Sequence, residues 1–206
     1  MLVGVTLKLA VLGDSIAWGQ GAARERERLA PRLVEGLERH GFEVSARVFA
    51  VPGARSAGLA AQVTACVPWG PDLAVVVIGA NDLTHLVPLD GAVDALGLAV
   101  RRLRAAGAEV VVAPAPDLST VPHVPIFLRD AVRAAGEELR TRQSAVVLRE
   151  QGRVADADHR ASRAFGSDRS LFSADLFHPS SAGYAVIADS LLPTLLEAAR
   201  SRLTPA

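Results

Sequence analysis

The chain has 206 residues, which is the size of one domain with room for a sizeable apolar core. Half of the residues are hydrophobic, and this proportion excludes disorder over most of the length. Basic and acidic residues number 22 each, so the net charge is zero and nothing favours nucleic acid or an anionic membrane as a partner. We therefore expect a single domain over residues 1–206. The composition predicts no particular oligomeric state.

The sole cysteine and the N-terminal segment bear on where the protein works. Cys66 has no partner for an internal disulfide and lies in an apolar stretch, which indicates a small buried residue. The N-terminal apolar segment is interrupted by Lys8 and follows no basic residue, unlike a secretion signal. No apolar stretch has the length of a membrane span, and we expect a cytoplasmic protein. All basic residues except Lys8 are Arg, a composition that fits both high-GC coding and heat adaptation.

Apolar runs that are typical of strands alternate along the chain with longer patterns that are typical of helices. The predicted strands are Lys8–Leu12, Val44–Val51, Leu73–Ile78, Val110–Ala113 and Ala145–Leu148. The predicted helices are Arg24–His40, Ser56–Val67, Asp90–Ala106, Ile126–Arg142 and about Ser181–Arg202. The strands are continuous apolar runs rich in Val, which indicates a sheet covered on both faces. The alternation predicts an α/β fold, a three-layer α/β/α sandwich around a five-stranded parallel sheet with flavodoxin-like strand order.

Two longer connections interrupt this pattern. Residues 114–125 are rich in proline and predict a stiff loop after a strand, while the polar segment Gln151–Phe172 predicts a longer loop. In open parallel sheets, ligands bind outside the carboxyl ends of the strands. The candidate functional residues of this chain lie where a strand ends or a helix begins, so we expect the site at that edge.

Ser15 follows the first predicted strand in the tripeptide Gly13-Asp14-Ser15. A serine at a strand-to-helix turn exposes its hydroxyl group, and its own N–H can point into the same space. For this tripeptide alone, the simpler interpretation is that Asp14 and Ser15 make turn or capping hydrogen bonds.

Asp175 and His178 form an Asp-x-x-His pattern near the C-terminus. With His178 as a general base, a serine hydroxyl becomes a usable nucleophile, and the carboxylate fixes the imidazole tautomer and stabilises its positive form. The alternative is a capping pair ahead of the last helix, or a surface histidine on a loop.

Asn81 is the only asparagine of the chain and follows the third predicted strand in Gly79-Ala80-Asn81-Asp82. Its side-chain NH₂ can donate to a developing oxyanion. The alternative is a turn residue, because asparagine tolerates left-handed geometry. Gly53 likewise either makes a bend or brings an unobstructed backbone N–H to the oxyanion.

Taken in order, these blocks resemble the SGNH (GDSL-type) esterase and lipase family, which is named for Ser, Gly, Asn and His. The blocks are Gly13-Asp14-Ser15-Ile16, the turn around Gly53, Gly79-Ala80-Asn81-Asp82, and Asp175-Leu176-Phe177-His178-Pro179 continuing into Ala182-Gly183-Tyr184-Ala185. The resemblance spans nearly the whole chain, and its spacing agrees with the strand ends placed from the apolar pattern. Two departures are Ile16, where the family name implies Leu, and Phe49, where many members carry a polar residue.

The resemblance implies a role for each block. Ser15 is expected to be the nucleophile, His178 the base and Asp175 its orienting partner. The Ser15 and Gly53 N–H groups and the Asn81 side chain are expected to form the oxyanion hole. No cofactor and no metal is implied.

Other patterns predict no cofactor site. Gly19-Gln20-Gly21 is part of a dinucleotide-binding pattern, but Arg24 stands in the place of the third glycine and the glycines do not directly follow the strand. The sequence has neither a Gly-x-Ser-x-Gly elbow nor a P-loop. The spacing of Asp156, Asp158 and His159 favours a solvated loop over a metal site.

We therefore expect a carboxylic ester hydrolase that acts on a small-molecule ester through an acyl-enzyme on Ser15. A short pocket beside Trp18 and the lack of an obvious amphipathic lid favour small acyl groups. Trp18 and His85 are both candidates for lining that pocket, with core packing for Trp18 and solvent exposure for His85 as the alternatives. A deacetylase, thioesterase, lysophospholipase or acyltransferase stays open within the same chemistry. The non-enzymatic alternative is a flavodoxin-like module that binds an anionic ligand at helix N-termini.

Overall fold

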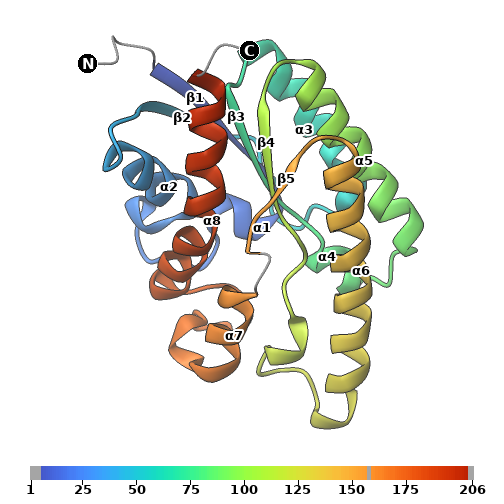
Figure 1. Cartoon of the computed structure of the whole chain (residues 1–206). Helices are drawn as coiled ribbons and strands as arrows, with labels where there is room; N and C mark the ends of the chain where they lie inside the picture. The colour runs from blue at the N-terminus through green and yellow to red at the C-terminus, as the bar shows by residue number, and fades with distance from the viewer. Residues whose placement is uncertain (1–5, 157–158, 204–206) are drawn as a thin grey trace.

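The computed structural model of the chain describes residues 6–156 and 159–203. Its centre is a five-stranded sheet with the order β2-β1-β3-β4-β5, in which all neighbouring strands are parallel (Figure 1). The strands are β1 (Thr6–Gly13), β2 (Glu43–Val48), β3 (Leu73–Val77), β4 (Glu109–Ala113) and β5 (Arg153–Val154). The predicted flavodoxin-like strand order is therefore confirmed.

Helices cover both faces of the sheet, as the continuous apolar strands predict. Successive residues of β1 and β3 point to opposite faces, and both sets are buried in apolar cores. One core includes the helices α2 (Leu29–Glu38) and α8 (Ser181–Leu203). The other includes α3 (Leu59–Cys66), α5 (Leu89–Ala105) and α6 (Arg129–Arg149). Figure 1 shows these two groups of helices on opposite sides of the sheet, which makes the three-layer sandwich.

Three short helices lie at the carboxyl ends of the strands. They are α1 (Ser15–Trp18), α4 (Ala80–Thr84) and α7 (Arg160–Ser167), and they follow β1, β3 and β5. In Figure 1, α1 and α4 lie near the middle of the molecule, below the amino ends of the strands, and α7 lies lower. The predicted edge of the sheet is therefore built from short turns of helix that begin close to the strand ends.

The fifth predicted strand was placed in the wrong segment. Residues 145–148 belong to α6, where Leu139, Gln143, Val146 and Val147 are buried at helical spacing and Leu148 is exposed. A short apolar run fits a strand and a buried helix equally well, and here the helix period decides. The actual β5 is only two residues long and lies in the segment predicted to be a loop, which also contains α7.

The five predicted helices correspond in order to α2, α3, α5, α6 and α8, with shifts at their ends. Residues 25–27 form a 3₁₀ turn, so α2 begins at Leu29 rather than at Arg24. Similarly, α6 begins at Arg129 and ends at Arg149, later than predicted at both ends. The starts of α5 and α8 lie within one residue of the predicted positions. No helix of the described residues is long and apolar enough to cross a membrane.

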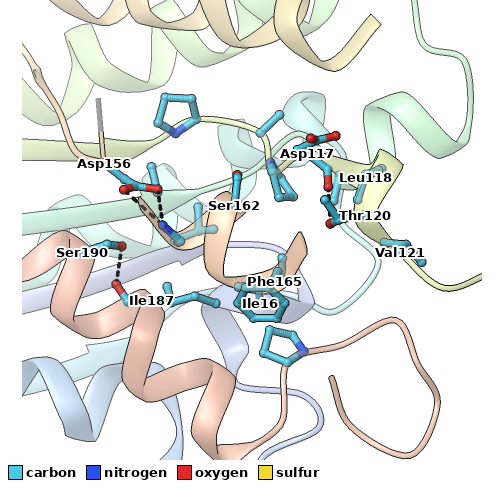
Figure 2. Close-up of a pocket in the computed structure, with 18 of the residues that line it drawn as sticks. Ile16, Asp117, Leu118, Thr120, Val121, Asp156, Ser162, Phe165, Ile187 and Ser190 are labelled. Atoms are coloured by element: carbon cyan, nitrogen blue, oxygen red, sulfur yellow. Dashed lines mark hydrogen bonds between the residues drawn. The ribbon is translucent and has the colours of Figure 1, made fainter. Parts of the chain in front are cut away.

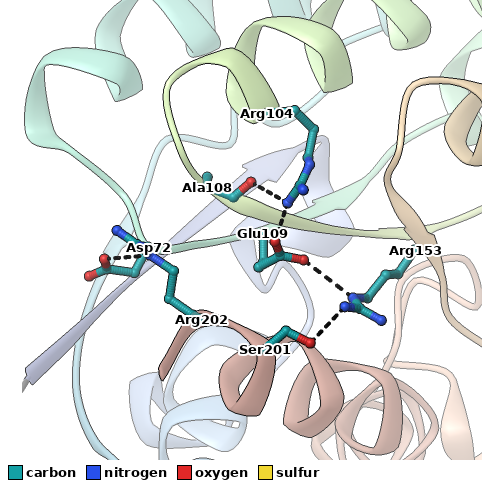
Figure 3. A network of polar contacts seen from close by, with 7 residues as sticks. All are labelled: Asp72, Arg104, Ala108, Glu109, Arg153, Ser201 and Arg202. Carbon is teal, nitrogen blue, oxygen red and sulfur yellow. Dashed lines mark hydrogen bonds and ion pairs between the residues drawn. The ribbon is translucent and has the colours of Figure 1, made fainter. Parts of the chain in front are cut away.

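Ion pairs and hydrogen bonds join the amino ends of β3, β4 and β5 to the end of α8 (Figure 3). Glu109 contacts Arg104 and lies 3.4 Å from Arg153, whose guanidinium also donates to the Ser201 hydroxyl at 2.9 Å. Arg202 pairs with Asp72 at 3.1 Å. These contacts lie at the opposite end of the sheet from α1, α4 and α7.

Candidate active site

Ser15 is the first residue of α1, two residues after the end of β1. The turn is held to the sheet by the Asp14 N–H, which donates to the carbonyl oxygen of Val77 at 3.1 Å. Gly13 makes this turn possible because it has φ of +132°, a conformation that favours glycine. Ser15 is 6% exposed, so its hydroxyl group lies in a largely desolvated position.

Asp14 is a buried carboxyl group beside the serine. Its Oδ1 accepts a hydrogen bond from the Ile16 N–H at 2.9 Å, so the predicted capping interaction is present. Its Oδ2 has no hydrogen-bond partner among the described residues. Burial raises the pKa of Asp14 to about 7; the Ile16 N–H opposes this shift and the nearby Asp82 carboxylate adds to it.

A chain of hydrogen bonds joins Ser15, His178 and Asp175. The Ser15 Oγ lies 3.0 Å from His178 Nε2, and His178 Nδ1 lies 2.6 Å from Asp175 Oδ2. Because an ionised carboxylate only accepts, Nδ1 must donate to Asp175, which leaves Nε2 free to accept from the serine hydroxyl in the neutral imidazole. The structure thus brings together the three residues to which the family resemblance assigned the roles of nucleophile, base and orienting partner.

The Asp175 carboxylate is stabilised by its own turn. Its Oδ1 accepts from the Ser173 hydroxyl at 2.8 Å and from the N–H groups of Phe177 and His178, each at 2.9 Å. Partial burial alone raises the pKa of this carboxyl, but these bonds and the bond to the His178 ring outweigh burial and hold the pKa well below its usual range. Leu176, in the middle of the turn, has φ of +56°, a strained conformation for this residue type. The turn therefore keeps Asp175 ionised beside the imidazole.

Gly53 and Asn81 lie on neighbouring segments. Gly53 is in the turn after β2 with φ of +77°, and no atom lies within 4 Å of where its Cβ would be, so its backbone is open on that side. The Asn81 Nδ2 in α4 donates to the carbonyl oxygen of Ala54 at 3.0 Å. A primary amide carries two N–H groups, and this bond uses one of them.

A buried pair connects the same two segments. The Asp82 carboxylate, which is fully buried, accepts from the Ser56 hydroxyl at 2.9 Å and from the Ser56 N–H at 3.0 Å. This pair and the bond between Asn81 and Ala54 attach the turn of Gly53 to α4 at two points. This pair could not be predicted from the sequence, because a serine in a turn and an aspartate beside Asn81 have many other uses.

A cavity of about 110 Å³ opens beside Ser15 and His178. Most of its wall is apolar, and Figure 2 shows Ile16 of α1, Phe165 of α7 and Ile187 of α8 close together in that wall. The walls come from α1, the loop after β4, α7, the Asp175 turn and α8. Both long connections described from the sequence, residues 114–125 and Gln151–Phe172, contribute to this wall, whereas no sequence motif pointed to the α8 residues.

The polar part of the cavity contains Asp156 and His159, which were considered above as candidate metal ligands. Arg140 Nη1 donates to His159 Nδ1 at 2.5 Å, and the Asp156 carboxylate accepts N–H bonds at the start of α7. Within residues 6–156 and 159–203, no group of three or more His, Cys, Asp or Glu residues could hold a metal ion. Asp158 lies outside the described residues.

Neither aromatic candidate lines this cavity. The Trp18 ring lies beneath the guanidinium of Arg28 at 4.2 Å and remains 36% exposed, so it is neither core nor pocket wall. His85 is exposed, and its Nδ1 contacts the carbonyl oxygen of Asn81 at 2.9 Å. The cavity lies beside Ile16 rather than beside Trp18, so the expectation of a short pocket beside Trp18 is wrong.

The chain is similar to known proteins in sequence. The model of the GDSL-like lipase/acylhydrolase family matches residues 11–186. The GDSL-like esterase Rv1075c of Mycobacterium tuberculosis (strain ATCC 25618 / H37Rv) is 37% identical over 199 residues, which make up 95% of this chain and 63% of that protein. The chain therefore spans less than two thirds of the length of this relative.

Solved structures share the fold. The crystal structure of TesA superposes with a TM-score of 0.70 at 23% identity, covering 96% of this chain and 98% of that one. Axe2, an acetylxylan esterase from Geobacillus stearothermophilus, superposes with a TM-score of 0.70 at 17% identity, covering 95% and 96% of the two chains. At these identities the similarity concerns the arrangement of the layers.

The buried carboxyl of Asp14 predicts a pH dependence of stability. Its pKa of about 7 in the folded protein exceeds its ordinary value of 3.8, so between these values the folded state binds more protons than the unfolded state. The contribution of Asp14 to the free energy of unfolding is therefore largest at low pH and is lost as the pH rises from about 4 to 7. Asp14→Asn keeps a capping side chain and removes the titration.

Urea unfolding of both proteins across this range measures the effect. We expect the free energy of unfolding of the native chain, minus that of Asp14→Asn, to fall steadily toward neutral pH and to level off above it. A difference that stays constant or rises with pH contradicts the assignment.

Proposed function

Because the chain belongs to the GDSL-like lipase/acylhydrolase family, we propose that it is a serine esterase that hydrolyses carboxylic esters. The observation that carries this proposal is the hydrogen-bonded chain from the Ser15 hydroxyl through the His178 ring to the Asp175 carboxylate. A binding module has no need of a serine hydroxyl aligned with a histidine nitrogen whose other nitrogen is fixed by a carboxylate. The proposed substrate is a small-molecule ester.

In the proposed acylation step, the Ser15 Oγ attacks the ester carbonyl carbon while His178 Nε2 takes the hydroxyl proton. The Asp175 carboxylate, held ionised by its turn, stabilises the imidazolium that forms. The tetrahedral intermediate then collapses, the bond to the alcohol oxygen breaks, and His178 returns the proton to that oxygen. Water repeats the sequence on the acyl-enzyme and releases the acid. Each proton has a donor and an acceptor on this chain or on the reactants, so the proposal includes no cofactor and no metal.

The negative charge of the intermediate needs donors that are in place before the reaction. We assign this role to the backbone N–H groups of Ser15 and Gly53 and to the second N–H of the Asn81 amide. Three features support it: the open backbone at Gly53, the bond from Asn81 to the neighbouring Ala54, and the start of α1 at Ser15.

Removal of the nucleophile tests the reaction itself. Ser15→Ala should lower kcat for p-nitrophenyl acetate by about 10⁴-fold or more, because the attacking atom is lost while the fold is kept. The native chain should react covalently with a fluorophosphonate probe at Ser15, and the variant should not. Full turnover by a folded Ser15→Ala protein would refute the proposal.

Truncation of the amide tests the oxyanion assignment separately. Asn81→Ala should lower kcat by about 10²–10³-fold with little change in KM, because the lost bond forms mainly in the transition state. His85→Ala, at the exposed end of the same short helix, is the matched control and should retain its kcat. If Asn81→Ala keeps kcat within about 3-fold, the amide only braces the turn of Gly53.

The cavity supports small acyl groups. Its volume of about 110 Å³ is well below the roughly 300–1,000 Å³ of pockets that hold drug-sized ligands, so a short acyl chain is the better match. The apolar wall around Ile16, Phe165 and Ile187 suits an alkyl chain rather than a charged group. We therefore place the acyl group of the substrate there.

Acyl chain length is the corresponding prediction. Rates on p-nitrophenyl esters should be highest for short acyl chains and should fall for long ones, because a cavity of this size accommodates few methylene groups. Ile187→Phe, which narrows the cavity, should slow six- and eight-carbon esters relative to the acetate. A maximum at chains of about 14 carbons or more, or an unchanged profile in a folded Ile187→Phe protein, would contradict this placement.

A further inference from the structure

The peptide groups around Gly13 connect the serine turn to the rest of the site. Gly13 ends β1, and its carbonyl oxygen accepts from the Val51 N–H at 3.1 Å, two residues before Gly53. The next residue, Asp14, donates its N–H to the carbonyl oxygen of Val77. The backbone at Gly13 therefore meets both the turn of Gly53 and the end of β3, which leads to Asn81.

One side chain binds both backbone groups of Gly13. The Gln62 Oε1 accepts from the Gly13 N–H at 2.7 Å, and the Gln62 Nε2 donates to the Gly13 carbonyl oxygen at 2.8 Å. Gln62 is 4% exposed and projects from α3, which is otherwise packed through Leu59, Val63 and Cys66. The bonding fixes the orientation of the amide, because a backbone N–H needs an oxygen partner and a carbonyl needs a donor.

We propose that Gln62 is a positioning residue for the nucleophile, acting through Gly13 to set where the Ser15 hydroxyl and N–H point; this proposal rests on the proposed esterase function. The primary amide takes the place of a neighbouring strand at the point where β1 turns into α1. It holds the two peptide planes of Gly13, and Ser15 begins only two residues later.

The chemistry of the amide explains why a simple packing residue would not serve. A buried backbone N–H without a partner is costly, and an apolar side chain at position 62 leaves the Gly13 N–H without its Gln62 partner. Gly13 has φ of +132°, a conformation that glycine alone adopts readily, and the two bonds from Gln62 add to the bond from Val51 in holding it. A small rotation of the Gly13 peptide moves Ser15 relative to His178, and misplacement by about 1 Å costs on the order of 10²-fold in rate.

A carboxyl group at this position makes the effect switchable. In Gln62→Glu, the neutral acid reproduces both bonds, since its carbonyl oxygen accepts from the Gly13 N–H and its O–H donates to the Gly13 carbonyl. The ionised form loses the donor and turns a negative oxygen toward that carbonyl. Burial favours the neutral form of a glutamate, so the introduced carboxyl group ionises at a higher pH than an exposed glutamate does. Gln62→Met has a similar length and loses both bonds at every pH.

The experiment compares kcat, KM and the rate of fluorophosphonate labelling from about pH 5 to pH 8, well below the thermal midpoint of each protein. For Gln62→Met we expect kcat and the labelling rate to be about 10- to 100-fold below the native values at every pH, with KM within about 2-fold. For Gln62→Glu we expect near-native kcat at the acid end and a ratio to the native kcat that falls as the pH rises. The ratio to the native kcat removes any pH dependence that the two proteins share.

Val63→Ala is the matched control, since Val63 is the buried neighbour of Gln62 on α3. It should lower the thermal midpoint and leave kcat unchanged. The proposal is overturned if Gln62→Met retains kcat within about 2-fold, if the Gln62→Glu ratio is independent of pH, or if Val63→Ala loses as much kcat. An active Ser15→Ala protein instead refutes the esterase function, so the two failures are distinguishable.

Discussion

The site depends on how closely the end of β1 approaches the end of β3. A Cβ at Gly13 would lie 1.8 Å from the carbonyl oxygen of Val77, so any other residue would push apart two central strands. The same carbonyl oxygen accepts the Asp14 N–H, which starts the serine turn directly from the sheet. Ser15 follows β1 and Asn81 follows β3, so this contact sets how far the nucleophile lies from the amide of the proposed oxyanion hole.

The two ends of the sheet use different kinds of polar group. The amino end carries Arg–carboxylate pairs that are partly exposed, as in Figure 3. Beneath the site, buried strand ends are bound by the neutral amides of Gln62 and Gln143; the latter accepts from Ala115 and donates to Ile78. An amide satisfies backbone groups without adding a further charge to an end of the sheet that already holds the buried carboxyl groups of Asp14 and Asp82. The carboxylate that the site does use, Asp175, lies on a partly exposed turn.

The candidate residues for the reaction were named from the sequence, but the side chains that hold them in place were not. The strand β3 is apolar throughout, and β1 and β4 have buried apolar runs that continue to their carboxyl ends, so these ends, and Ser15 and Asn81 beyond two of them, were located from the apolar pattern. The strand β5 was missed because two residues are too short to show a period, and its place was given to a buried helix segment. Gln62 was missed for another reason: a single glutamine in an apolar helix carries no signal until the backbone group it meets is known.

The residues named from the sequence are those proposed for the reaction, whereas the residues that were missed include those that determine which substrate fits. The groups that we propose for attack, proton transfer and charge stabilisation belong to the sequence blocks, while the cavity wall comes largely from the loop after β4, from α7 and from α8. These segments follow no motif, because an apolar wall only needs side chains of suitable volume. A change on α7 or α8 can therefore alter which acyl group fits without moving Ser15 or His178. Two proteins with the same blocks and the same layers can differ in substrate for this reason, and the choice of ester has to be derived from the shape of the cavity.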